Sequence, residues 1–97
     1  MKHSFLTLFK QWEQKNKRAT KRLKEAERKW NNAADAYKKQ LAHNNRIHNA
    51  GKSIPLASQK REDRLGNEID RREELYNRAE AHWEDVQDES RAFKKMR

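Results

Sequence analysis

Lysine and arginine side chains in the first half of the sequence are the residues whose spacing best fits a chemical role. Six of them form two neighbouring rows on a helix, in steps of seven residues or close beside them: Lys10, Lys17, Arg18, Lys21, Lys24 and Arg28. Rows of cations can follow the phosphates of a nucleic acid. Most charge runs only keep a helix face solvated. The six residues are therefore candidate contacts for phosphates or for an acidic protein surface.

The distribution of charge favours a binding role over simple solvation. The formal net charge is +9. Residues 1–50 hold 13 Lys and Arg against 4 Asp and Glu, whereas residues 51–97 hold 11 of each kind. The positive excess therefore belongs wholly to the first half of the chain. No exposed aromatic residue is expected among these cations, so single-strand stacking on aromatic platforms is not expected.

Catalytic and metal-binding patterns are missing from the sequence. His43 and His48 are five residues apart, a spacing that does not place two metal ligands on one helix face. With no cysteine there is no thiolate nucleophile and no Cys-based zinc site. Acidic residues are numerous between 73 and 89, but a thin helical rod offers no enclosed pocket to perturb their pKa values. We expect a non-enzymatic protein without metal or cofactor.

An apolar repeat in alternating steps of three and four predicts the elements that carry these side chains. In the first half it comprises Phe9, Trp12, Asn16, Ala19, Leu23, Ala26, Trp30, Ala33 and Tyr37. In the second half it comprises Leu65, Ile69, Arg72, Tyr76, Ala79, Trp83, Val86, Ser90 and Phe93. With 33% hydrophobic and 40% charged residues, the chain has too few apolar residues to build a thick globular core.

The break between the repeats predicts one domain over residues 1–97. Helix 1 spans about 4–46, a turn about 47–54 and helix 2 about 55–95. Gly51 suits a left-handed helix end, and Pro55 suits a first helical turn. The fold class is all-α, with two long helices forming an antiparallel coiled-coil hairpin.

The antiparallel arrangement follows from how the two repeats fit each other. In the register that sets Phe9 opposite Phe93, large residues repeatedly face small ones, as Ala19 faces Trp83. The same register brings Lys15 opposite Glu89. A parallel homodimer would instead stack each large residue on itself and leave gaps between.

The open end of the hairpin is the second candidate surface. Phe5, Leu6, Leu8 and Phe9 make an apolar face wider than one partner helix covers. Such a face predicts a docking patch for another protein, or a homodimer interface that forms a four-helix bundle. An N-terminal turn folded over the end is the alternative. The apolar run is too short to span a bilayer, so we expect a cytoplasmic protein without a membrane partner.

The turn presents the single proline of the chain between two apolar residues, Ile54-Pro55-Leu56. An Ile-Pro bond in a mobile loop is a possible handle for a prolyl isomerase. A lone proline more often simply begins a helix.

The basic hairpin, the lack of cysteine and the proline at the turn together resemble the anti-RecBCD protein family of lambdoid phages. That resemblance covers the whole chain as a shape and includes no diagnostic motif. It implies a protein that binds the host RecBCD nuclease-helicase, with the RecC subunit as the docking site, and a prolyl isomerase at Pro55.

The sequence thus leads to a non-enzymatic, phage-type accessory protein that binds and modulates a host DNA-processing enzyme in the host cytoplasm. The alternative is direct nucleic-acid binding by the basic face of helix 1. A plain structural or oligomerisation rod is the third reading.

Overall fold

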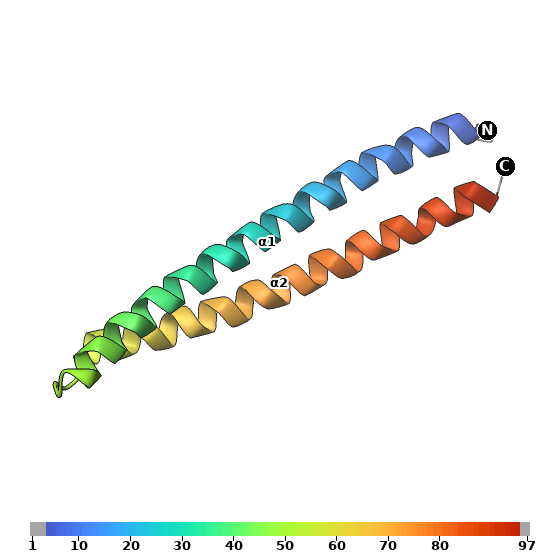
Figure 1. Ribbon diagram of the computed structural model, residues 1–97. Helices are drawn as coiled ribbons and strands as arrows, with labels where there is room; N and C mark the ends of the chain where they lie inside the picture. Colours follow the sequence, from blue (N-terminus) through green and yellow to red (C-terminus); the bar gives the residue numbers. More distant parts are fainter. Residues whose placement is uncertain (1–3, 96–97) are drawn as a thin grey trace.

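Two long helices make up the described part of the chain. The computed structural model describes residues 4–95, with α1 at Phe5–Asn49 and α2 at Leu56–Lys95. The helices run antiparallel, so the start of α1 and the end of α2 meet at one end of the rod (Figure 1). The rod measures 73 × 20 × 13 Å. The predicted all-α helical hairpin is confirmed.

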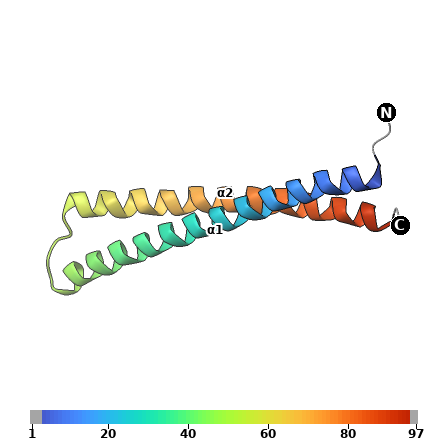
Figure 2. The ribbon, with the colours of Figure 1, turned by 90° about the horizontal axis from the view of Figure 1, so that it is seen from above.

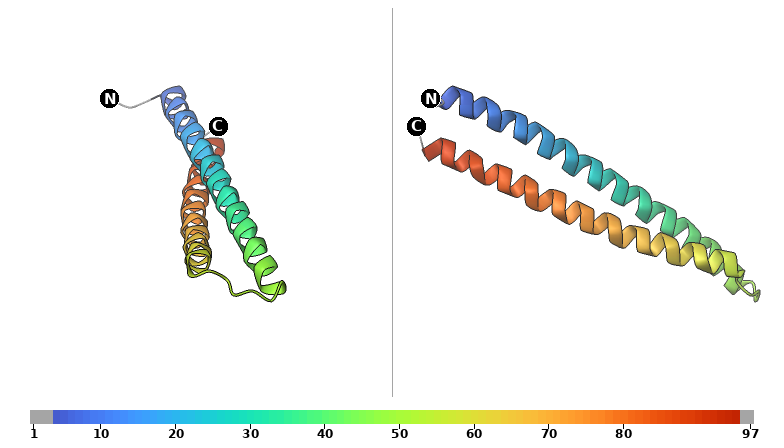
Figure 3. Two further views of the ribbon diagram at one scale, coloured as in Figure 1. Left: turned by 90° about the vertical axis from the view of Figure 1, so that its left-hand side faces the viewer. Right: turned by 180° about the vertical axis from the view of Figure 1, so that it is seen from behind.

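The two helices cross along their length, as Figures 2 and 3 show from above and from the side. Crossing at a shallow angle is how helices keep a stripe of core residues in contact over many turns. The crossing explains why one three–four repeat on each helix suffices to hold a rod this long.

The predicted core positions are confirmed, because every residue of both repeats is buried or half-buried. Ala19, Ala33, Ala79 and Val86 are the buried apolar residues in the described range. Most large side chains keep one edge in solvent, since a two-helix core has no third layer to cover them. The core is therefore a narrow line of contacts with little depth.

The register is the predicted one. The ring centroids of Phe9 and Phe93 lie 6.2 Å apart, and Lys15 Nζ donates to Glu89 Oε1 at 3.0 Å. Trp30, which this register sets opposite Arg72, packs against Tyr76 one turn further along α2, with ring centroids 5.1 Å apart.

Hydrogen bonds inside the contact line tie the two helices at defined heights. The side chain of Asn44, only 1% exposed, accepts a bond from Gln40 Nε2 at 2.9 Å. Its amide group donates to the Ser58 carbonyl at 3.3 Å and to Glu62 Oε1 at 3.2 Å. Within residues 4–95, no buried side-chain polar atom lacks a hydrogen-bond partner. A buried Asn with partners on both helices favours one register over all others.

The turn is defined by a glycine-dependent helix end. Gly51 has φ +73°, in the left-handed region, and its N–H donates to the His48 carbonyl at 3.0 Å. The Lys52 N–H donates to the Ile47 carbonyl at 3.2 Å, which completes a Schellman motif. Helix α1 therefore extends three residues beyond its expected end at 46. The turn therefore begins later than the predicted residue 47, because the cap at Gly51 lets the helix continue to Asn49.

We predict that Asn44→Ala lowers the free energy of unfolding by about 2 kcal/mol, because it removes a buried side chain and leaves its half-buried partners without their hydrogen bonds. Urea titration followed by circular dichroism measures the change. The neighbouring Asn45 is exposed, so Asn45→Ala is the matched control and should alter stability by less than about 0.5 kcal/mol. Equal effects of the two substitutions would show that the buried network adds nothing.

Candidate interaction surfaces

An aromatic cluster closes the open end of the hairpin. Phe93 of α2 makes edge-to-face contacts with three aromatic rings of α1, at centroid distances of 5.8 Å to Phe5, 6.2 Å to Phe9 and 6.3 Å to Trp12. Trp12 Nε1 also donates to the Val86 carbonyl at 2.7 Å. These contacts hold the first turns of α1 against the last turns of α2.

The predicted apolar residues at this end have different environments. Phe9 is half-buried in the aromatic cluster, and Leu8 is also half-buried. Phe5 is 40% exposed and Leu6 60% exposed, although both belong to α1. A cavity of about 280 Å³ opens between the aromatic rings, Ser90 and Lys94. Of the four predicted apolar residues, Phe5 and Leu6 are thus exposed, next to a cavity between the aromatic rings.

A continuous cationic ridge runs along α1 between residues 10 and 29. Its nine members are all exposed: Lys10, Lys15, Lys17, Arg18, Lys21, Arg22, Lys24, Arg28 and Lys29. Two of them form ion pairs, Lys15 with Glu89 at 3.0 Å and Arg28 with Glu25 at 2.9 Å. The other seven form no ion pair with any residue in the described range. The ridge therefore has free positive charge.

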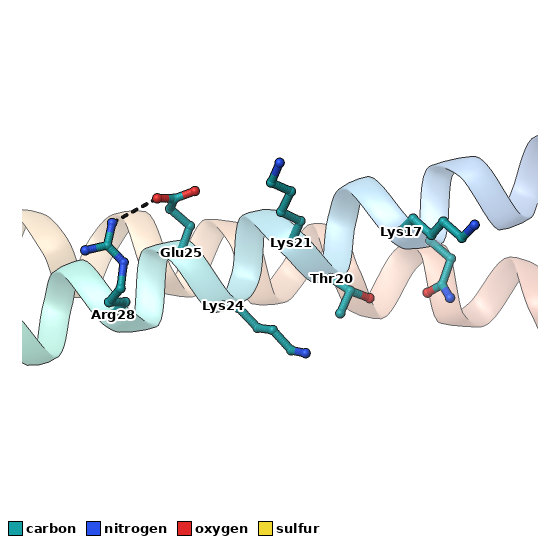
Figure 4. Close-up of a pocket in the computed structure, with 7 residues that line it drawn as sticks. Lys17, Thr20, Lys21, Lys24, Glu25 and Arg28 are labelled. Atoms are coloured by element: carbon teal, nitrogen blue, oxygen red, sulfur yellow. Dashed lines mark hydrogen bonds and ion pairs between the residues drawn. The ribbon is translucent and has the colours of Figure 1, made fainter.

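Shallow depressions lie on both sides of the cationic ridge. One is lined by Lys17, Lys24 and Arg28, whose side chains Figure 4 shows extending from α1 in different directions. The other lies between the helices, where its lining is Arg18, Lys21, Arg22, Glu25, Ala26 and Lys29 from α1 and Arg72, Leu75 and Ala79 from α2. Lys21 and Glu25 line both depressions and so stand on the crest between them.

Arg22, Lys29 and Arg72 were missed as candidate binding residues. Arg22 and Lys29 continue a third row that begins at Lys15, and its seven-residue spacing was a readable signal. Arg72 occupies a position of the apolar repeat, where the sequence predicts a core residue. It lines the surface only because the depression beside Ala79 is open.

Two titratable groups have shifted pKa values, each with a local cause. The Arg28 hydrogen bond, with the nearby charges of Arg28, Lys29 and Lys21, holds the pKa of Glu25 below its ordinary value. A hydrogen bond to Glu80 and partial desolvation raise the pKa of Tyr76 above its ordinary value. Glu25 therefore stays ionised within the cationic ridge and neutralises part of its charge.

The proline turn is exposed at the other end of the rod. Pro55 is exposed and Leu56 is 64% exposed, while Ile54 is half-buried. The Pro55 carbonyl accepts the bond from the Gln59 N–H at 3.1 Å, so Pro55 is the last residue before α2.

Among residues 4–95, no three His, Asp or Glu side chains lie close enough together to hold a metal ion. None of the described helices has a stretch long and apolar enough to cross a membrane. The chain matches no protein-family model, and neither a curated protein nor a solved structure is significantly similar to it.

We predict that Phe93→Ala frees the open end without unfolding the rod, because it removes three aromatic contacts at once. Amide hydrogen exchange should accelerate by about tenfold or more in residues 5–12 and 88–95, and stay unchanged around Asn44. Uniform acceleration along both helices would show that the cluster supports the whole hairpin and not this end alone.

Proposed function

We propose that this chain is a non-enzymatic, phage-type accessory protein that binds and modulates a host DNA-processing enzyme through protein–protein contacts. The observation that carries the proposal is the exposure of Leu6 and Phe5 directly beside an aromatic cluster. Full burial of an exposed side chain of this size contributes about 1.5–3 kcal/mol, and covering the exposed parts of Leu6 and Phe5 supplies a share of that. A rod with this end and shallow, open depressions is suited to docking rather than to enclosing a substrate.

The proposed target is a RecBCD-like nuclease-helicase, with the RecC subunit as the docking site. Support for this target comes from the resemblance in shape and from the charge of the chain. An enzyme that handles DNA holds the anionic phosphates of that DNA close to its own surface. The electrostatic field of those phosphates can steer a chain of net charge +9 toward the enzyme.

We predict that Leu6→Asp weakens the complex with a purified RecBCD-type enzyme by about 10- to 100-fold, since it loses one buried apolar anchor. Biolayer interferometry measures the affinity. Leu56→Asp is the matched control, because Leu56 is equally exposed and both leucines lie in the first turn of their helix. A carboxylate is tolerated in either first turn, so both variants should keep the fold.

Capture from nuclease-treated host lysate identifies the target without assuming it. Recovery of a RecBCD-type enzyme by the wild type and by Leu56→Asp, but not by Leu6→Asp, supports the proposal. Wild-type binding by Leu6→Asp contradicts docking through this end. Sedimentation of the free chain tests the predicted homodimer, in which Leu6 would be covered by a second copy.

A prolyl isomerase is the second proposed partner, at Ile54-Pro55-Leu56. The exposure of Pro55 and Leu56 supports it, because both are accessible at the tip of the rod. We predict that Pro55→Ala abolishes isomerase binding and leaves binding of the RecBCD-type enzyme unchanged, as measured by titration with each purified protein. Binding of the isomerase to Pro55→Ala at wild-type strength would place it elsewhere.

A further inference from the structure

The structure shows how the charges of the cationic ridge are distributed around α1, which their spacing in the sequence alone did not reveal. Lys17 and Lys24 line the depression on one side, while Arg18, Arg22 and Lys29 line the depression on the other. Lys21 and Glu25 line both and stand between them, and Glu25 is paired with Arg28. Positive charge therefore projects from two flanks of α1 as well as from its crest, over roughly half of the helix circumference.

We infer that the cationic ridge binds duplex DNA, with α1 lying in the major groove and its two flanks facing the two phosphate strands. The B-form major groove is about 12 Å wide and admits an α-helix, whose diameter with side chains is about 10–12 Å. Residues 10–29 span about 30 Å, between five and six turns of helix. A helix with cations on both flanks fits a groove with anionic walls on both sides.

The charge balance of the ridge supports this fit. Nine Lys and Arg stand against three Glu between residues 10 and 29, and one of the three, Glu25, is bonded to Arg28. Seven cations form no ion pair within the described residues. Of the acidic residues of α2, Glu89 forms an ion pair with a member of the ridge, Lys15, in the described range.

Other polyanions fit the ridge less well. The aromatic residues of α1 beyond Phe5 are half-buried in the core, so a single strand finds no stacking platform on the described ridge. The A-form major groove of duplex RNA is deep and narrow and excludes a helix. An acidic protein surface has no reason to engage both flanks of a convex ridge.

Fluorescence anisotropy with a labelled DNA duplex of about 20 base pairs tests the inference across a series of salt concentrations. We expect log K to fall with log salt with a slope of about −6, since seven free cations each release about 0.9 counterion. A single strand, an RNA duplex of the same sequence and poly-glutamate serve as competitors. Equal or tighter binding of any of these overturns the inference, as does failure to bind the DNA duplex.

Three variants, each losing three positive charges, test whether both flanks are engaged. One flank is changed by Lys10→Gln, Lys17→Gln and Lys24→Gln, and the other by Arg18→Gln, Arg22→Gln and Lys29→Gln. The control carries Arg61→Gln, Arg64→Gln and Arg71→Gln, which are exposed residues of α2. Gln is a good helix former, and circular dichroism verifies that each variant keeps its helices.

Each flank variant should reduce the magnitude of the salt slope by about three, while the control leaves it unchanged. A change in only one flank variant contradicts insertion into a groove, because it indicates contact from one side. An equal change in the control shows that only total charge matters and overturns the inference. Leu6→Asp should bind DNA like the wild type, so failure of the docking proposal and failure of this inference are distinguishable.

Discussion

The hairpin depends on the burial of a single line of side chains between two helices. With only two helices, no residue is covered from more than one direction, and the fully buried residues are small or, as for Asn44, hydrogen-bonded. Apolar contact alone would tolerate sliding by a heptad, since the repeat looks similar after each step. Hydrogen bonds that cross between the helices at fixed heights, at Trp12, Asn44 and Trp83, remove that freedom. The buried row of side chains stabilises the hairpin, and the hydrogen bonds of its polar members select one register.

The same narrow core decides where function can lie. Two helices leave most of each surface in solvent, and the composition uses that surface differently on α1 and α2. Acidic residues of α2 repeatedly pair with arginines one turn away, as Glu68 does with Arg72. On α1 most cations between 10 and 29 form no ion pair within the described residues. Charge is therefore neutralised locally on α2 and left available on α1.

The sequence predicted the core because periodicity is a local property that two long helices must obey. Residues 9–37 and 65–93 were assigned correctly on that ground. The contact positions nevertheless continue to Asn44 on α1 and to Ser58 and Glu62 on α2. The residues at these positions are polar, so the apolar repeat in the sequence does not include them. Their burial depends on partners from the other helix, which no local pattern reveals. The asparagine-rich stretch before Gly51 also looked like a break, although the backbone cap at Gly51 keeps it helical.

The Schellman turn at Gly51 has a consequence for how the rod assembles. The shortest loop that joins the helices lies there, so contacts next to the turn close at the smallest entropic cost, and each later layer closes a longer loop. We therefore expect contacts beside the turn to form before those of Phe93 and Phe5. The contacts at the open end are then also the ones that can break and re-form while those nearer the turn remain intact.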